Sequence, residues 1–234
     1  MIRSAFILSV IVLSSCAPTR YVVPLLKREK AFSISYGGPV MKDANAAMPV
    51  PLVNVTFAKG KSERLTYFGG LHLTPTVEGY FAGEVGVLKE WYYNSNTKLG
   101  FTTNFVANVM ADKWEGKLDF IPQFDANLYW HFKGDPHYHC DCPGDPKYEM
   151  FTYFGFQSHY KVVSNYDYIA PFKDDLLFSP HFGFSFGASQ WKLNTEIKWI
   201  QPWVDNTRHD PEIWNPAMPT GTFGGYLTFY YTLE

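Results

Sequence analysis

The chain has 234 residues, a formal net charge of −2 and an aromatic content of 18%. A near-neutral charge without a basic stripe excludes a nucleic-acid-binding protein, so no nucleic-acid partner is expected. The length fits one large domain, because no long linker or break in composition divides the chain. Tyr and Phe are spread along the whole sequence, which indicates many half-buried strands.

The N-terminus has the organisation of a bacterial export signal. One arginine precedes an apolar run from Ala5 to Leu13, which is too short to span a bilayer stably. Residues 13–16, LSSC, resemble the lipobox of bacterial lipoproteins, a family in which the cysteine is lipidated and the chain is cut before it. We therefore expect a signal peptide over 1–15 and a diacylglyceryl-type lipid on Cys16. A spacer over 16–29 then leads to the folded domain. An ordinary secretory signal that contains a cysteine is the alternative.

From residue 30 onward, apolar and polar residues alternate with the period of two that is typical of β-strands. In residues 116–132, GKLDFIPQFDANLYWHF, the even positions are mainly apolar and the odd positions are mostly Asp, Gln, Asn and His. Ten strands are predicted near 30–38, 50–59, 64–74, 80–92, 98–110, 117–132, 148–163, 176–188, 191–203 and 221–233. Many strands at regular spacing predict a closed barrel or a sandwich.

Alternation alone does not tell which face points inward. A lipid-anchored, lipocalin-like barrel would enclose a hydrophobic ligand with its apolar face, whereas a transmembrane barrel would turn that face to lipid. Strands of about 10 to 14 residues can cross a bilayer when tilted. Phe and Trp occur too often to fit inside a small barrel, and Trp91, Trp191 and Trp199 mark strand ends as in aromatic girdles. We therefore expect an all-β, antiparallel, up-and-down transmembrane β-barrel over 30–234, surrounded by outer-membrane lipids.

The connections indicate the orientation of this barrel. Even-numbered connections are short, as at 60–63 and 94–97, whereas several odd-numbered ones are long, as at 164–175 and 204–220. Outer-membrane barrels have short periplasmic turns and longer outer loops, so both termini are expected in the periplasm. The sixth connection, 133–147, is the exception, because it is a long loop at the end where the other turns are short.

This loop contains the motif HYHCDC, with the metal-ligand or disulfide candidates His137, His139, Cys140 and Cys142. In an oxidising compartment the two cysteines could form a disulfide, although C-x-C closes a small, strained ring. The same residues supply a Cys2His2 set for zinc, but with tighter spacing than structural zinc sites use. An unpaired polar loop is the third alternative, and each alternative is compatible with docking to a periplasmic partner.

A second group of polar residues is expected to point into the lumen near the outer mouth. Its members are His72, Glu84, Asp119, His159 and His181. The predicted connection at 164–175 would pair residues of the two flanking strands whose numbers sum to about 339. His159 and His181 would then lie nearly opposite each other. The main interpretation is a set of ion pairs and hydrogen bonds that fills a narrow barrel, because buried charges need partners. A metal or anion site at the two histidines is the alternative.

An enzyme would need Ser and His within hydrogen-bond reach and an acid to orient the His. Ser179 and His181 share a face, with Asp119 or Glu84 as the third member. No phosphate loop, nucleophile elbow or dinucleotide fingerprint occurs in the sequence. We therefore expect no enzymatic activity and no cofactor apart from the lipid on Cys16.

The whole chain resembles Gram-negative outer-membrane β-barrel proteins that are also lipoproteins. The resemblance rests on the lipobox at Leu13–Cys16 and on the closing strand Phe223–Leu233. It implies an accessory subunit of a larger envelope machine. We expect a non-enzymatic accessory or structural subunit of a transport, secretion or assembly complex, which contacts a protein partner through 133–147. A lipid-anchored carrier of a hydrophobic ligand is the alternative, and an outer-membrane hydrolase is the third.

Overall fold

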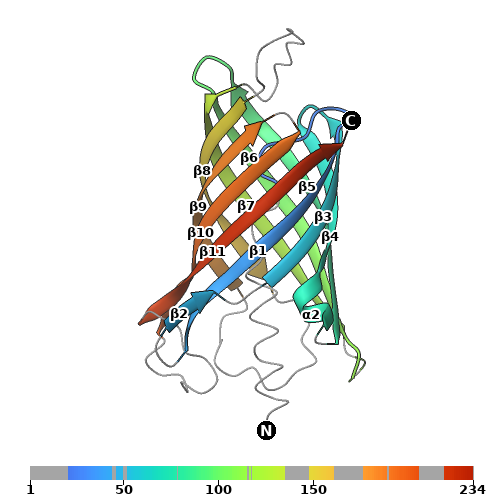
Figure 1. Ribbon diagram of the computed structural model, residues 1–234, viewed down its shortest axis with the longest axis vertical. Coiled ribbons are helices and arrows are strands. Elements are labelled where there is room, and N and C mark those ends of the chain that lie inside the picture. Colours follow the sequence, from blue (N-terminus) through green and yellow to red (C-terminus); the bar gives the residue numbers. More distant parts are fainter. Residues whose placement is uncertain are drawn as a thin grey trace.

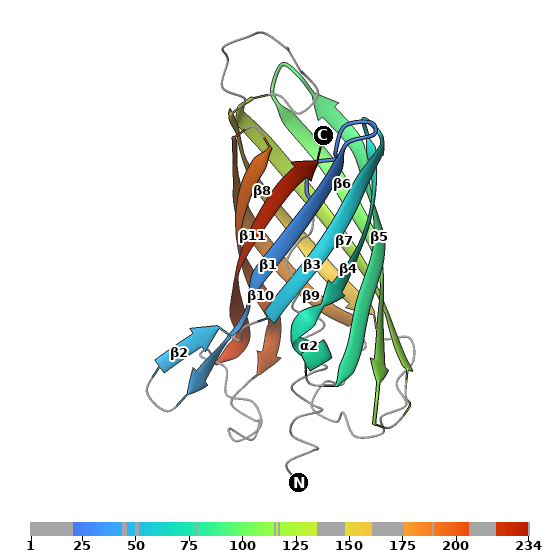
Figure 2. The same ribbon diagram turned by 45° about the vertical axis from the view of Figure 1, so that its right-hand side comes forward.

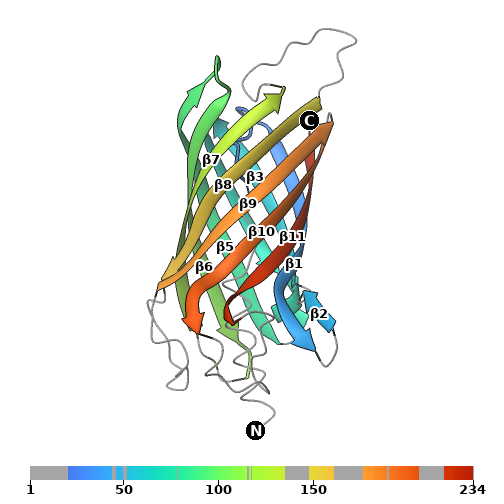
Figure 3. The same ribbon diagram turned by 90° about the vertical axis from the view of Figure 1, so that its left-hand side faces the viewer.

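Ten antiparallel strands close into one tall barrel (Figure 1). The computed structural model describes residues 21–43, 46–49, 52–77, 79–114, 116, 118–134, 148–160, 176–188, 190–205 and 219–233. The barrel strands are β1 (Lys30–Asp43), β3 (Leu52–Ser62), β4 (Leu65–His72), β5 (Tyr80–Asn94), β6 (Leu99–Asp112), β7 (Leu118–Lys133), β8 (Tyr148–Tyr160), β9 (Leu176–Ala188), β10 (Trp191–Asp205) and β11 (Thr220–Leu233). Each strand pairs with its neighbour along the chain, and β1 pairs with β11 to close the ring (Figure 3). The predicted fold class is confirmed.

The two ends of the barrel differ. At one end β3 joins β4, β5 joins β6 and β9 joins β10 through short connections, and β11 finishes there; we call it the turn end. At the opposite, loop end, β2 (Ala46–Pro49) pairs with Val40–Asp43 of β1 and projects from the wall as a hairpin (Figure 2). Helix α2 (Leu73–Val77) also lies there. The sequence predicted strands at 30–38 and 50–59 with a connection between them, whereas β1 continues to Asp43 and β2 follows it.

No helix of the described ranges is long and apolar enough to cross a membrane.

The outward face of the barrel is apolar along its height. Phe154, Phe182 and Ile197 lie on neighbouring strands and are 61%, 55% and 59% exposed. A continuous apolar surface of this kind is rare on a soluble monomer, and it fits the lipid-facing belt of a transmembrane barrel. The carrier alternative, which needs this face inside, is therefore wrong. The carrier alternative fails because the lumen of a ten-stranded barrel is too small to hold so many Phe and Trp rings.

Exposed aromatic rings border this belt at the turn end, as expected for an interfacial girdle. They include Trp91, Tyr92, Trp130, Tyr148 and Trp191. Several are arranged in contact with one another or with a cation: Trp191 lies 4.6 Å from the ring of Phe229, and the Lys89 ammonium lies 5.8 Å from the Trp91 ring.

The inward face is polar and densely filled. Asn104, Asn127 and Gln157 have no exposed surface, and two tyrosine rings contact glycines on the next strand. Tyr129 covers Gly100, and Tyr153 covers Gly183; a methyl group on either glycine would overlap the ring. These glycines allow large side chains to cross a narrow lumen.

The residues before β1 also lie in the lumen. Tyr21–Leu26, which we call the luminal segment, is almost entirely buried. Asn104 Nδ2 donates to the Tyr21 carbonyl at 3.0 Å, Thr102 Oγ1 donates to the Val22 carbonyl at 2.8 Å, and the Leu25 amide donates to Thr66 Oγ1 at 2.9 Å. The described part of the expected spacer over 16–29 is therefore packed against the barrel wall as far as Leu26.

Candidate functional site

The five predicted luminal residues all lie buried inside the barrel. His72, Glu84, Asp119, His159 and His181 are each at most 7% exposed. They do not form one cluster. His72 Nε2 lies 3.3 Å from Glu84 Oε2, whereas His181 Nε2 lies 2.6 Å from Asn127 Oδ1 on β7. Within the described ranges, no three His, Cys, Asp or Glu residues are grouped so that they could hold a metal ion.

The expected juxtaposition of His159 and His181 is wrong. In the β8–β9 register, His159 lies opposite Leu177, and His181 lies opposite Gly155. The two histidines are therefore at different heights. The register is constant along this pair and differs by four residues from the one that would align the two histidines, while the apolar faces stay outside.

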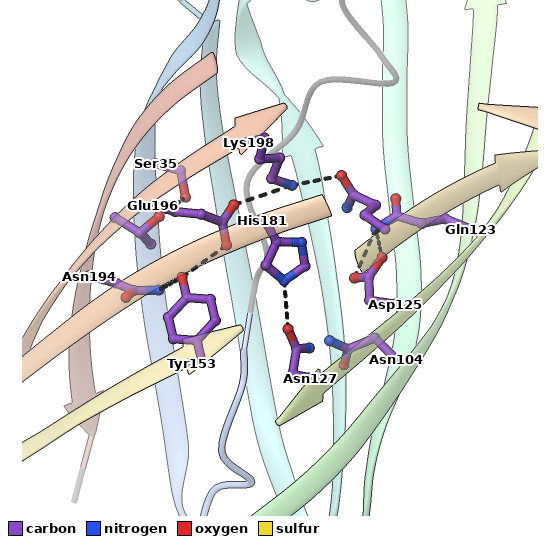
Figure 4. Close-up of polar contacts among 12 residues, drawn as sticks. Ser35, Asn104, Gln123, Asp125, Asn127, Tyr153, His181, Asn194, Glu196 and Lys198 are labelled. Carbon is purple, nitrogen blue, oxygen red and sulfur yellow. Dashed lines mark hydrogen bonds and ion pairs between the residues drawn. The ribbon is translucent and has the colours of Figure 1, made fainter. Parts of the chain in front are cut away.

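A buried ion pair and its hydrogen bonds form the centre of the lumen (Figure 4). Lys198 Nζ lies 3.2 Å from Glu196 Oε1 and donates to Gln157 Oε1 at 2.6 Å. The Tyr153 hydroxyl donates to Glu196 Oε2 at 2.9 Å and accepts from Asn194 Nδ2 at 2.9 Å. These residues come from β8 and β10, and each polar group of the pair meets at least one partner. Such pairing is what allows an ammonium to be fully buried.

A second polar network lies near the turn end, beside the luminal segment. Tyr129 donates to Glu90 Oε2 at 2.6 Å, and Lys192 Nζ lies 2.5 Å from Glu149 Oε2. His131 Nδ1 is 3.7 Å from the other oxygen of Glu149. Sequence reasoning missed Glu90, because a bulge between Glu90 and Tyr92 breaks the alternation of β5 at this point.

A small pocket lies beside the luminal segment. A pocket of about 30 Å³ is lined by Tyr21, Ser185, Asn194 and Tyr230, among others. This volume holds a water molecule or two. Tyr21 itself packs on Tyr230 and Phe68, with ring centroids 5.2 and 5.9 Å apart. At this level the lumen is filled by the segment and by its aromatic contacts.

The residues considered for a hydrolase are only partly brought together. Ser179 and His181 are adjacent on the inward face of β9 and are both 2% exposed. Ser179 lies opposite Gln157, which lies opposite Asp125 on β7, so Asp125 rather than Asp119 is the carboxylate at this height. Asp119 lies nearer the loop end, opposite Met110. His181 is positioned by an amide oxygen.

The other predicted chemistry lies outside the described residues. This applies to Cys16 and to His137, His139, Cys140 and Cys142 in the 133–147 connection. The structure places only the two ends of that connection, Lys133 on β7 and Tyr148 on β8, both at the turn end.

Comparison with solved structures gives similar barrels at low sequence identity. The NanC porin matches with a TM-score of 0.45 and 9% identity over 87% of this chain and 100% of that chain. LpxR from Salmonella typhimurium matches with a TM-score of 0.46 and 7% identity over 88% and 99%. OprG, an outer membrane protein of Pseudomonas aeruginosa, matches at 0.28 and 8% over 92% and 100%. No family model and no functionally curated protein matches the chain. The chain itself forms a closed ten-stranded antiparallel β-barrel.

One expectation is corrected by these matches. The sequence predicted no enzymatic activity, but LpxR, which is among the similar structures, is an outer-membrane enzyme. The expectation that this chain has no enzymatic activity is therefore withdrawn.

Proposed function

We propose that this barrel is an accessory subunit of an envelope transport, secretion or assembly complex. The barrel and a lipid on Cys16 hold it in the outer membrane, with both termini on the periplasmic side. The observation that carries the proposal is the luminal segment, which fills the barrel near the turn end. A filled barrel acts through the surfaces at its two ends rather than through an open passage.

The wall is built to hold this segment. Thr66, Thr102 and Asn104 come from two different strands, and their side chains bond the segment's backbone groups in place of water. Deeper in the barrel, the Lys198–Glu196 pair and its partners occupy the lumen. A general pore needs a water-filled interior, which a ten-stranded barrel packed in this way does not offer.

The 133–147 connection is the proposed contact with the partner. It leaves and rejoins the barrel at the turn end, where the other connections are short. Its residues His137, His139, Cys140 and Cys142 give it a chemistry that the neighbouring turns lack. A disulfide, a bound metal and a free polar loop remain the three alternatives for this motif, and all of them leave the loop available for docking.

Site-specific photo-crosslinking in cells tests the proposal. A photoreactive amino acid at Tyr138 should give one reproducible cross-linked envelope protein. The same probe at Trp114, which is 71% exposed near the loop end, is the matched control and should not cross-link that protein. A barrel that is monomeric after mild detergent extraction, gives no cross-link from Tyr138 and conducts ions in planar bilayers would contradict the proposal.

A further inference from the structure

Basic side chains gather on one sector of the turn end, over β1, β3, β4 and β5. This basic sector consists of Lys27, Arg28, Lys30, Lys59, Lys61, Arg64 and Lys89. All except Lys89, which is half-buried, are exposed. Clustered, accessible cations of one sign make a local positive potential that attracts anions.

The strand register places like charges side by side in this sector. Lys30 of β1 lies directly opposite Lys59 of β3, and both point to the outside of the barrel. Lys61 follows on the same face of β3. Like charges directly opposite each other destabilise an antiparallel pair, and an anion bound between the two lysines would relieve this repulsion.

The carboxylates of the same region do not neutralise these lysines. Glu29 Oε2 accepts a hydrogen bond from the Leu26 amide at 2.7 Å. Glu90 points into the lumen, where it accepts from Tyr129 and lies 3.8 Å from Arg64. Glu63 is the one exposed carboxylate among the described residues of this sector. The sector therefore keeps a strong excess of positive charge.

The position of the basic sector along the barrel axis indicates what kind of anion it contacts. Lys59 lies two residues beyond Phe57, which is 47% exposed, and Lys30 lies two residues before Phe32, which is 45% exposed. Tyr67, opposite Lys59 on β4, is also exposed. The lysines thus stand on the lipid-facing side, where the apolar belt ends and lipid headgroups begin. Long basic side chains at this depth extend their charge to the interface.

We propose that the basic sector binds the phosphate headgroups of anionic glycerophospholipids. The inference goes beyond the proposed function and does not depend on a protein partner. An acidic protein would have to displace lipid from outward-facing strands to reach Lys30 and Lys59, whereas a headgroup is already at that depth. The proposal also assigns the turn end to the phospholipid leaflet, since each basic residue near an anionic surface adds to the attraction.

The test compares three forms of the full-length chain, purified in neutral detergent and stripped of lipid. K30Q/K59Q/K61Q/K89Q removes charge from the sector, the corresponding Arg variant keeps it, and K98Q/K133Q is the matched control at the same end of the barrel. Lys98 and Lys133 lie away from the sector, where Lys133 covers the Tyr148 ring. Heat-dependent migration on SDS gels verifies folding of each form.

Native mass spectrometry then measures binding of phosphatidylglycerol, phosphatidylcholine and lipopolysaccharide. We expect the wild type to prefer phosphatidylglycerol over phosphatidylcholine at least tenfold. The Gln variant should lose this preference, and the Arg and control variants should keep it. Millimolar inorganic phosphate should not displace the lipid. Equal binding of the two phospholipids, an unchanged Gln variant, displacement by phosphate or preference for lipopolysaccharide would each overturn the proposal.

Discussion

The two faces of the barrel wall obey different rules, and three consecutive residues of β10 show the difference. Glu196 and Lys198 point inward, are at most 4% exposed and each depend on named partners. Ile197 lies between them, points outward and is 59% exposed to the lipid side. The outward position requires only an apolar side chain, whereas the inward ones require a specific set of neighbours. Inward and outward substitutions should therefore differ in how much they lower the free energy of unfolding. They should also differ in whether a second substitution restores it.

The largest effect is expected from Lys198→Met. It leaves the Glu196 carboxylate buried without its ammonium partner, and breaking a buried pair in this way costs about 3–5 kcal/mol. Urea unfolding of the barrel refolded into vesicles measures the loss. The double variant K198M/E196Q removes both charges, keeps an acceptor for Tyr153 and should recover most of the stability. If the double variant is as unstable as the single one, packing rather than charge pairing sets the cost.

A charge on the outward face should cost less and should not be rescued by a luminal change. Ile197→Lys places an ammonium on the lipid side of the same strand, which costs about 2–4 kcal/mol at the middle of a bilayer and less near its surfaces. Ile197→Val, which stays apolar, is the matched control and should lose under about 1.5 kcal/mol. The same unfolding experiment applies. Equal stability of the Lys and Val variants would contradict the assignment of this face to lipid.

A smaller, local effect is expected where the luminal segment meets the wall. Asn104→Leu removes the donor to the Tyr21 carbonyl and leaves it buried, at a cost of about 1–3 kcal/mol. The segment should then leave the wall roughly tenfold more often, since about 1.4 kcal/mol is tenfold in an equilibrium constant. The rate of maleimide labelling of a cysteine at Val23, in a C140S/C142S background, measures this opening.

Asn108→Leu is the control for that experiment. Asn108 contacts Gln123 and the Ile121 carbonyl instead of the luminal segment, so its loss should leave the labelling rate unchanged. Equal acceleration in both variants would mean that the lumen loosens as a whole, and the wall would then not hold the segment through specific bonds.

The sequence predicted the wall well because a single physical requirement repeats at every second residue. All ten barrel strands were found with small errors at their ends, since lipid on one side and a polar lumen on the other impose a strict period of two. The sequence predicts less well the register of one strand against the next. A register that slips by any even number of residues keeps both faces, and His181 lies opposite Gly155, four residues from His159, the partner predicted for it.

The side chains and the segment that fill the lumen were harder to predict from the sequence than the strands. The pairing of Lys198 with Glu196 follows from their shared face, but the role of Glu90 was hidden by a bulge. The luminal segment carries no alternation, and it was therefore interpreted as a spacer. Its composition held a usable signal, because Tyr21–Leu26 is almost wholly apolar and a solvated spacer has no reason to be.

The smallest effect on the stability of the barrel is expected from Cys16→Ala, which removes the proposed lipidation site. Loss of the thiol should abolish incorporation of labelled palmitate and leave urea unfolding within about 0.5 kcal/mol of wild type. Because the strands hold the barrel in the membrane, the variant should stay membrane-bound. Palmitate labelling that persists would exclude Cys16 as the lipidation site, and release of the variant into the soluble fraction would contradict the lipid-facing assignment of the outer wall.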